Sequence, residues 1–480
     1  MTSFSSGVRF ALYPTSPQAT LLRQWIGCQR VIYNAKVAEE KYFNMFRRKA
    51  LTHAGSRTPL DQQYAQFNSE LTPWLSEVPS QILRNGAVRW MGAKQRQLKG
   101  LAGAPSSKRA HGRQSALITS ELFQFLPVDP ADPALGHRLL LGTPRFPVGE
   151  LRFTAHRSYP LPKQIVISVE AGRWFVGFSF EVDSPEILRS PGELAYELNN
   201  LSDEQVAQLT VGYDRGVVNR LADSSDVSYQ VDEAVQQRVA RKEIRTRKYQ
   251  RKMARQVKGS VNRSKTKAKL ASLQNYRKRC AQDWAHKTTY RMVTSGARIH
   301  VLEALQVRNM SKKAKPKLID GKWAKNGAAA KSGLNKAILS SAWGRVATYV
   351  QYKAARRNQL VLFVPAQYSS QECSECTYTH LDNRPSQSEF VCQRCGHAEH
   401  ADINASCVIK KRGIAALRAG IVIKPKKRVA MRRKKIEQTG VVCSEVSVER
   451  SSKSWEGSAL AAHTASKQKF DNCEVRSPFL

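Results

Sequence analysis

Four cysteines near the C-terminal end of the sequence have the spacing of a metal site. They form two pairs with two residues inside each pair and fifteen between the pairs: Cys373, Cys376, Cys392 and Cys395. Two intervening residues let one tight turn present both thiolates to the same ion, and Gly396 after the second pair suits such a turn. Four thiolates fill a tetrahedron, so we predict a structural Zn²⁺ rather than a catalytic one. His397 and His400 lie nearby, but the sulfur set is complete without them.

Three acidic residues occur where a strand ends or a helix begins. Asp214 follows the apolar run 209–213, Glu303 follows the run 299–302, and Asp402 stands where a helix is expected to start. Taken singly, these residues could serve a turn, an ion pair with an arginine and a helix cap. Taken together, they could converge to hold two Mg²⁺ ions roughly 4 Å apart, because hard oxygen ligands suit Mg²⁺. One ion would activate a water, and the other would stabilise the leaving oxygen of a phosphodiester.

The elements around these acids predict an α/β arrangement for the second half of the chain. Strands are expected at 209–213, 299–302 and 360–365, with 228–231 as the hairpin partner of the first. Helices are expected at 232–297 and 334–357, the first interrupted near Gly259. Strands that alternate with helices are typical of α/β folds. The first half is expected to have a strand at 8–13, a helix at 16–46, a helical stretch at 59–99 that Pro73 and Pro79 break, a basic loop at 100–117 and a β-rich module at 120–183. Periodicity is lost after about residue 425, which predicts a basic, disordered tail.

The charge of the chain indicates the class of its partner. The sequence has 78 basic and 38 acidic side chains, a formal net charge of +40. Such an excess favours nucleic acid, because each neutralised phosphate releases a counterion. No apolar run approaches the ~20 residues of a membrane span, so no membrane partner is expected. Nine cysteines, an odd number with four of them clustered, favour a reducing, cytoplasmic setting over a disulfide framework. Ribosomal or chromatin-like proteins share such a charge, so charge alone predicts no chemistry.

Several segments together resemble the TnpB (OrfB) proteins of insertion sequences, which are relatives of the type V CRISPR effectors. The matching segments occur in the family's order and are RFALYPTSPQATLLRQWIGCQRVIYN at 9–34, VGYDRGVVN at 211–219, IHVLEALQVRNM at 299–310, GLNKAILSSAWGRVATYVQYKA at 333–354, the CSEC and CQRCGH pairs, and EHADINAS at 399–406. The likeness therefore touches both ends of residues 8–412.

This resemblance implies a fold of several modules. It implies an RNase H-like (RuvC) nuclease domain at 206–368 and 399–424, with a four-cysteine zinc ribbon inserted at 369–398. It also implies an N-terminal wedge β-barrel at 1–205 that carries a helical recognition insert at about 16–118. The family's catalytic acids fall on Asp214, Glu303 and Asp402, none of them substituted. Residues 425–480 extend beyond the resemblance, and the 100–160 region matches it least clearly.

The resemblance also implies a function. The family implies a guide-RNA-directed, Mg²⁺-dependent endonuclease that cuts double-stranded DNA beside a short motif, located with the nucleoid of a bacterium or archaeon. Base pairing would then read the sequence, while the basic helices at 238–279 contact the backbone. Two alternatives stay open: a transposase that performs strand transfer with the same carboxylates, and a zinc-ribbon regulator that binds nucleic acid without cutting it. The resemblance is also compatible with a separately encoded transposase as a further partner.

Overall fold

The computed structural model describes residues 3–49, 61–127, 136–183, 187–319 and 321–420. The chain divides into two units, Met1–Arg428 and Val429–Leu480, and every described residue belongs to the first. The tail predicted at 425–480 and part of the predicted insert therefore lie outside the described residues. No helix in the described ranges is long and apolar enough to cross a membrane.

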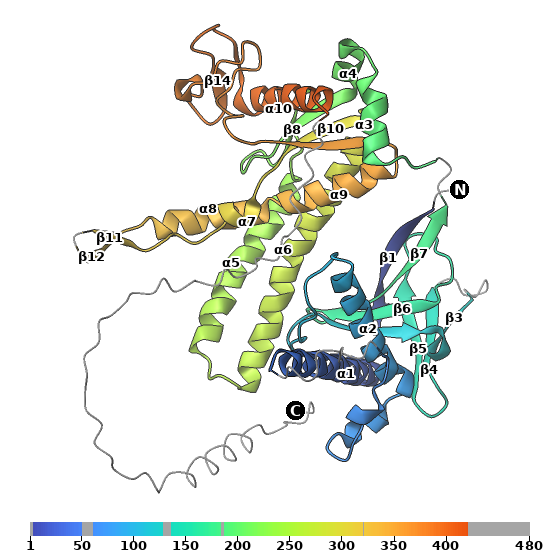
Figure 1. Cartoon of the computed structure of the whole chain (residues 1–480). Coiled ribbons are helices and arrows are strands. Elements are labelled where there is room, and N and C mark those ends of the chain that lie inside the picture. The colour runs from blue at the N-terminus through green and yellow to red at the C-terminus, as the bar shows by residue number, and fades with distance from the viewer. Residues whose placement is uncertain (1–2, 50–60, 128–135, 184–186, 320, 421–480) are drawn as a thin grey trace, which may run out of the picture. The chain divides into compact units, whose positions relative to one another are not determined.

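The first half contains one antiparallel sheet of seven strands in the order β2-β6-β7-β1-β5-β4-β3 (Figure 1). The strands are β1 (Ser3–Tyr13), β2 (Gln114–Thr119), β3 (Phe123–Leu126), β4 (His137–Gly142), β5 (Pro147–Thr154), β6 (Gln164–Glu170) and β7 (Arg173–Asp183). β1 pairs with both β5 and β7, which confirms that the predicted β-rich module continues the first strand. The closure of this sheet into a barrel stays a prediction.

Two helices cover this sheet. The predicted helix beginning at Ser16 is present as α1 (Ser16–Lys49), and its buried Leu22, Trp25 and Ile26 join the core formed by the strands. The helix predicted at 59–99 is shorter than expected. Regular helix begins only at α2 (Ser80–Leu98), and the described segment before it holds two short 3₁₀ helices, Ala65–Phe67 and Pro73–Glu77. Pro73 and Pro79 disfavour a continuous α-helix there, because proline lacks the backbone N–H that the helix uses.

The second half contains a four-stranded sheet in the order β13-β10-β8-β9. Its strands are β8 (Thr210–Asp214), β9 (Ala222–Asp223), β10 (Ile299–Glu303) and β13 (Leu360–Val364). β10 runs parallel to both β8 and β13, which confirms the α/β class predicted for this half. The predicted hairpin partner of β8 at 228–231 was wrong: Ala222–Asp223 pairs with β8, because the tight turn after Asp223 leaves Ser228 a single bridge to Ala222.

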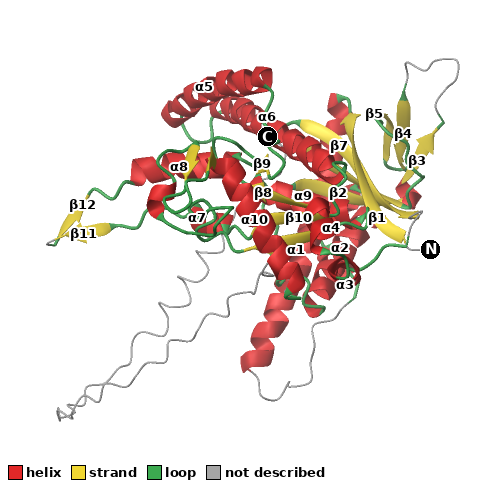
Figure 2. Ribbon diagram, turned by 90° about the horizontal axis from the view of Figure 1, so that it is seen from above, coloured by secondary structure: helices red, strands yellow, loops and turns green. Residues whose placement is uncertain are grey.

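Helices lie on both faces of this sheet (Figure 2). The helices of this half are α3 (Pro191–Asn199), α4 (Asp203–Leu209), α5 (Glu233–Arg255), α6 (Val261–Val293), α7 (Val307–Met310), α8 (Ala328–Ser340), α9 (Trp343–Ala355) and α10 (Ala401–Arg418), and not all of them pack against the sheet. One core joins α6 and α9 to the side chains of Tyr213 and Leu302, and another joins α3, α4 and α10 to Ile299 and Val301. The predicted interruption between α5 and α6 is confirmed at Gly259, where φ is +91°.

Two small hairpins complete the described elements. β11 (Lys317–Ile319) and β12 (Lys322–Ala324) form one hairpin, between α7 and α8. β14 (Glu389–Val391) and β15 (Ala398–His400) form the other, which leads directly into α10. This second hairpin therefore connects the cysteine-rich segment to the start of the helix that carries Asp402.

Candidate catalytic and metal-binding sites

The three predicted acids lie at one edge of the four-stranded sheet. Asp214 and Glu303 are the last residues of the parallel strands β8 and β10. Leu302 pairs with Tyr213, so Glu303 and Asp214 lie at the same level of neighbouring strands. Asp402 is the second residue of α10, as predicted, and the imidazole of His400 accepts a hydrogen bond from its backbone N–H at 3.2 Å.

Two glycines bring α10 close enough to the sheet to place Asp402 beside the other acids. A Cβ on Gly212 would lie 2.2 Å from the carbonyl oxygen of Ser406, and a Cβ on Gly413 would lie 2.3 Å from the side chain of Val301. Side chains two residues apart in a strand share a face. Asp214 therefore lies on the same face as Gly212, and Glu303 on the same face as Val301. Both carboxylates thus lie on the side of the sheet that α10 covers.

Each carboxylate has polar partners that fix its position. The hydroxyl of Ser369 donates to Oε1 of Glu303 at 2.9 Å. Asn219 Nδ2 donates to Oδ2 of Asp402 at 2.7 Å, and Arg384 Nη2 lies 3.5 Å from Oδ1 of the same carboxylate. The Arg215 guanidinium donates to the backbone carbonyl of Glu303 and so joins the end of β8 to the end of β10.

The three acids form a region of concentrated negative charge. Burial, followed by the nearby charges of Glu303 and Asp402, raises the pKa of Asp214 to about 7. Burial also raises the pKa of Glu303. Such mutual repulsion favours a bound divalent cation, which would neutralise the carboxylates. The donor set therefore fits Mg²⁺, although the three acids are not among the groups in the described residues whose ligand atoms all lie within 4.8 Å.

A cavity of about 280 Å³ opens beside this edge of the sheet. Asp214 and Asp402 line it, together with the loop at 215–219, Trp343 and Arg384. The indole N–H of Trp343 donates to the carbonyl of Gly216 at 3.0 Å and holds the loop against α9. Two of the three acids are therefore reachable from solvent, whereas Glu303 is only 5% exposed.

The four predicted cysteines meet in space. Their sulfur atoms all lie within 4.8 Å of one another, with 3.7 Å between Cys373 and Cys395 and 3.5 Å between Cys376 and Cys392. Zinc–sulfur bonds of ≈ 2.3 Å in a tetrahedron place sulfurs about 3.8 Å apart, so the cluster fits Zn²⁺. His397 and His400 are not among the side chains of this group in the described residues.

The cysteine cluster is attached to α10 by hydrogen bonds. The side chain of Asn404 accepts from the backbone N–H of Ser374 at 2.8 Å and donates to the carbonyl of Glu372 at 2.8 Å. Asn404 is fully buried and lies two residues after Asp402. The turn that carries the first cysteine pair therefore helps to fix the start of α10.

Comparison with known proteins relates these sites to a family. Residues 193–314 match the OrfB_IS605 model, described as "Probable transposase", and residues 1–42 match the HTH_OrfB_IS605 model, described as "Helix-turn-helix domain". Residues 343–409, which contain the cysteine cluster and Asp402, match "Cas12f1-like, TNB domain". By these matches the chain is similar to proteins of the TnpB/OrfB family. In this TnpB-like chain, residues 3–42 form β1 and most of α1.

Two curated relatives extend the likeness over most of the TnpB-like chain. A protein of Escherichia coli (strain K12) named "Putative RNA-guided DNA endonuclease InsQ" is 28% identical over 418 residues, 86% of this chain and 94% of that protein. A "Putative RNA-guided DNA endonuclease" of Streptomyces pristinaespiralis is 25% identical over 445 residues, 89% of this chain and 94% of that protein. A solved structure of a Cas12f1–sgRNA–target DNA complex aligns with a TM-score of 0.47 at 11% identity, covering 85% of this chain and 99% of that one.

Sequence reasoning missed four side chains around the acids of this TnpB-like chain. Arg215 and Asn219 lie within the VGYDRGVVN segment, which resembles the family motif, so proximity to Asp214 could have identified them. Ser369 and Arg384 have no comparable signal. Arg384 lies in the loop between the two cysteine pairs, 18 residues before Asp402, and only the folding of that loop brings the two side chains together.

We expect Arg384→Gln to slow DNA cleavage by about 10- to 100-fold, the usual cost of losing a partner that orients a metal ligand. Gln keeps most of the length of the side chain but removes the positive charge beside Asp402. Cleavage rates at saturating Mg²⁺ are the measurement. Arg394→Gln is the matched control, because Arg394 is an exposed arginine in the same segment. Equal rates for the two variants would contradict this role of Arg384.

We expect Cys373→Ser to lower the zinc content from about one ion per chain to a small fraction of that, since a structural site needs all four ligands. Residues 369–400 should then become sensitive to proteases, because metal binding and folding are coupled in such sites. Elemental analysis and limited proteolysis measure the two effects. Cys407→Ser, which changes a cysteine outside the cluster, should retain the zinc. Undiminished zinc in the Cys373 variant would refute the assignment.

Proposed function

We propose that this chain is an RNA-guided, Mg²⁺-dependent DNA endonuclease of an insertion element. The observation that carries the proposal is the meeting of Asp214, Glu303 and Asp402 at the carboxyl edge of two parallel strands, beside an open cavity. The family that the chain resembles and the names of its two curated relatives support the reaction and the need for a guide.

The chain has three modules under this proposal. Residues 206–368 and 399–424 are assigned to the RuvC-like nuclease domain, although residues 320 and 421–424 lie outside the described residues. The order and direction of β8, β9, β10 and β13 support this assignment. Residues 369–398 form the zinc ribbon, supported by the sulfur cluster. Residues 1–205 form the wedge with its recognition insert at about 16–118, supported by the seven-stranded sheet that α1 and α2 cover.

In the proposed site the three carboxylates hold Mg²⁺, which when bound would supply a positive centre for the attacking and leaving oxygens of a phosphodiester. The remaining roles fall to this chain's own side chains. Ser369 orients Glu303, Asn219 orients Asp402, and Arg215 holds the two strand ends at a fixed spacing. Arg384 lines the cavity, where its guanidinium suits a backbone phosphate.

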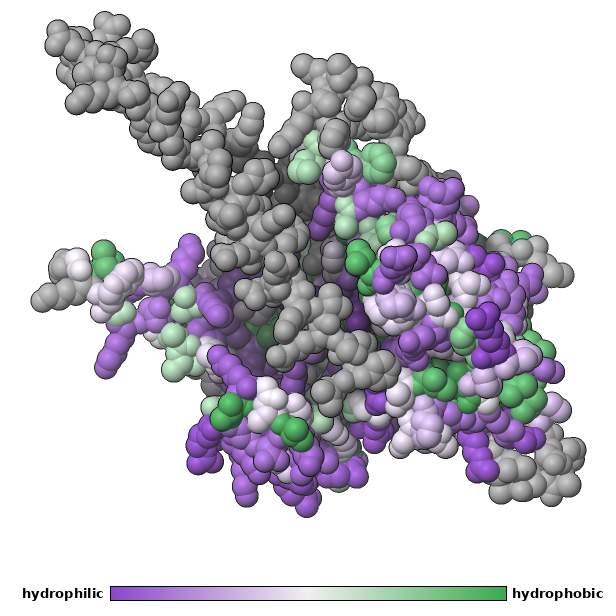
Figure 3. Space-filling model, turned by 90° about the horizontal axis from the view of Figure 1, so that it is seen from below, coloured by the Kyte–Doolittle hydropathy of each residue, from purple (hydrophilic) through white to green (hydrophobic). Residues whose placement is uncertain are grey.

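The proposed partners are a guide RNA and a double-stranded DNA target. The net charge of +40 supports a polyanionic partner. α5 alone has nine basic and two acidic residues, and none of its residues is fully buried. Hydrophilic side chains cover much of the surface of the described residues on the face drawn in Figure 3.

The decisive experiment is sequencing of the RNA that copurifies when the protein is expressed with its native flanking DNA. A discrete transcript with a constant scaffold and a variable end that matches the edge of the element supports the proposal. That end then supplies the guide for a cleavage assay with Mg²⁺. Only bulk RNA that moderate salt removes would contradict guided recognition, and joining of a labelled donor end to target DNA would favour strand transfer instead.

A further inference from the structure

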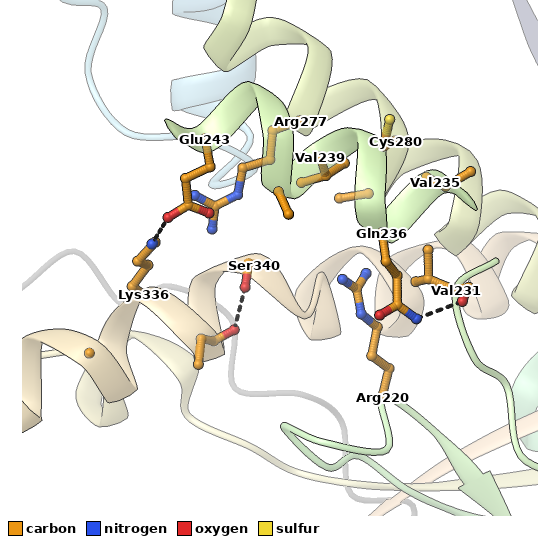
Figure 4. A pocket seen from close by; sticks show the side chains of 14 residues that line it. Arg220, Val231, Val235, Gln236, Val239, Glu243, Arg277, Cys280, Lys336 and Ser340 are labelled. Carbon is orange, nitrogen blue, oxygen red and sulfur yellow. Dashed lines mark hydrogen bonds and ion pairs between the residues drawn. The ribbon is translucent and has the colours of Figure 1, made fainter. Parts of the chain in front are cut away.

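A second cavity, of about 500 Å³, opens between α5, α6 and α8 (Figure 4). It shares no lining residue with the cavity beside the carboxylates. Its volume lies within the range of small-ligand pockets, roughly 300–1,000 Å³. None of the roles proposed above uses this cavity.

One wall of this cavity is apolar. Val235 and Val239 lie one turn apart on α5, and Ala281 of α6 and Ala337 of α8 line the same space. Residues four apart on a helix share a face. Both valines are only half-buried, since no residue of α5 is fully buried. α5 therefore leaves an apolar strip open to a ligand.

Two arginines line the same cavity without an acidic partner. Within the described residues, neither Arg220 nor Arg277 has a carboxylate oxygen within 4.0 Å. Glu243, the one acidic residue of the lining, pairs instead with Lys336 across one end of the cavity (Figure 4). Both arginines are half-buried in the lining of the cavity, and burial, followed by the charge of Arg277, lowers the pKa of Arg220. Such a pair suits an anion, above all a phosphate.

The position of Arg220 connects this cavity to the carboxylates. The loop at 215–219 lines the carboxylate cavity, and Arg220, the next residue, lines the second cavity. Asn219 donates to Asp402, so one short loop contacts the proposed catalytic site on one side and the arginine pair on the other. A nucleic acid strand whose phosphodiester lies at the carboxylates would therefore pass close to this second cavity.

We propose that the second cavity is a nucleotide slot, which holds one unpaired nucleotide of the DNA strand on which the carboxylates act. Its phosphate binds Arg220 and Arg277, and its base packs against Val235, Val239 and Ala337. This inference rests on the proposed function, because it takes the substrate strand as its occupant. The slot explains why an apolar wall and two arginines without acidic partners lie at the end of the loop at 215–219.

A bulky side chain introduced into the lining of the cavity tests this proposal. Gly333 lines the cavity from α8, and a Cβ at this position would meet no heavy atom within 4 Å, so a side chain added there begins in open space at the cavity lining. We expect Gly333→Trp to weaken binding of a short fluorescein-labelled single-stranded DNA by about tenfold, and Gly333→Ala to leave it unchanged. Fluorescence anisotropy with the full chain and no divalent cation measures the affinity.

Removal of the arginines gives an independent variant. Arg220→Gln with Arg277→Gln should also weaken DNA binding by about tenfold, and should lower the slope of log affinity against log salt by roughly 0.7 for each phosphate that is no longer neutralised. When the two arginine changes are combined with Gly333→Trp, the DNA affinity should fall little further than in either variant alone. The reason is that the arginine changes and the tryptophan act on the same nucleotide. The control variant, Arg251→Gln with Arg255→Gln, removes two exposed arginines of α5 that lie outside the cavity. Its loss of DNA affinity should add to the loss caused by Gly333→Trp.

Three results would overturn the slot. Unchanged DNA affinity in folded Gly333→Trp would show that no nucleotide enters the cavity. If the losses of affinity from Gly333→Trp and from the Arg220 and Arg277 changes were additive, the two sets of changes would act on different parts of the DNA. An equal loss for RNA of the same sequence would exclude the substrate strand as the specific occupant. The binding measurement needs neither Mg²⁺ nor cleavage. It therefore distinguishes a cavity that binds no nucleotide from a chain that has no nuclease activity.

Discussion

Asp214→Ala should abolish DNA cleavage, with a fall of at least about 1,000-fold in rate, roughly 4 kcal/mol of transition-state stabilisation. Asp214 is the acid that links the other two: burial, followed by the charges of Glu303 and Asp402, raises its pKa, and it lines the cavity together with Asp402. Without it, the remaining two carboxylates would not suffice to hold the proposed Mg²⁺, which would supply the positive charge for the displacement. Binding of guide RNA should change less than about twofold, because an acidic side chain does not contribute attraction to a polyanion.

The measurement is the single-turnover cleavage rate of a guided target, with RNA affinity determined in parallel. Asp214→Asn preserves the shape of the side chain and should be nearly as inactive, since the negative charge is what holds the metal. Asp283→Ala is the matched control, because it removes an exposed carboxylate from α6 that pairs only with Lys287 in the described residues. Cleavage by Asp214→Ala at the wild-type rate would refute the site.

Gly212→Ala should both destabilise the nuclease half and slow cleavage, although no functional group is removed. The added Cβ would lie 2.2 Å from the carbonyl oxygen of Ser406 and 2.5 Å from the backbone N of Lys410, so α10 would have to move away from β8. Overpacking of this kind costs about 3 kcal/mol. Because Asp402 lies on α10, the same movement would separate it from Asp214, and small misplacements of reacting groups lower rates strongly.

Denaturation midpoints and cleavage rates of the same preparations measure the two effects. Gly92→Ala is the control: Gly92 lies inside α2, and a Cβ there meets nothing within 4 Å. That variant should match or exceed the stability of the unchanged chain, since alanine favours helices over glycine by up to about 1 kcal/mol. A midpoint for Gly212→Ala equal to that of the unchanged chain would show that α10 does not need this close approach.

Local features of this chain could be predicted from its sequence. The cysteine spacing predicted the sulfur cluster, because two residues between cysteines bring both sulfurs to one turn whatever surrounds them. The strands that end at Asp214 and Glu303 and the helix that begins near Asp402 were also predicted, since short apolar runs and capping residues report on neighbouring positions. The resemblance to TnpB proteins selected these three acids from 38 acidic residues. Their catalytic role stays a prediction.

Only the tertiary structure decided how these features meet. The contact between Asn219 and Asp402 joins residues 183 positions apart, and Arg384 reaches Asp402 only because its loop folds back onto α10. The close approach that Gly212 and Gly413 permit depends on which element packs against β8 and β10, and no local pattern specifies that partner. The same is true of the arginine pair at the second cavity, which requires Arg220 and Arg277 from different elements. Spacing along the chain determines local geometry, whereas packing between distant segments determines which side chains share a site.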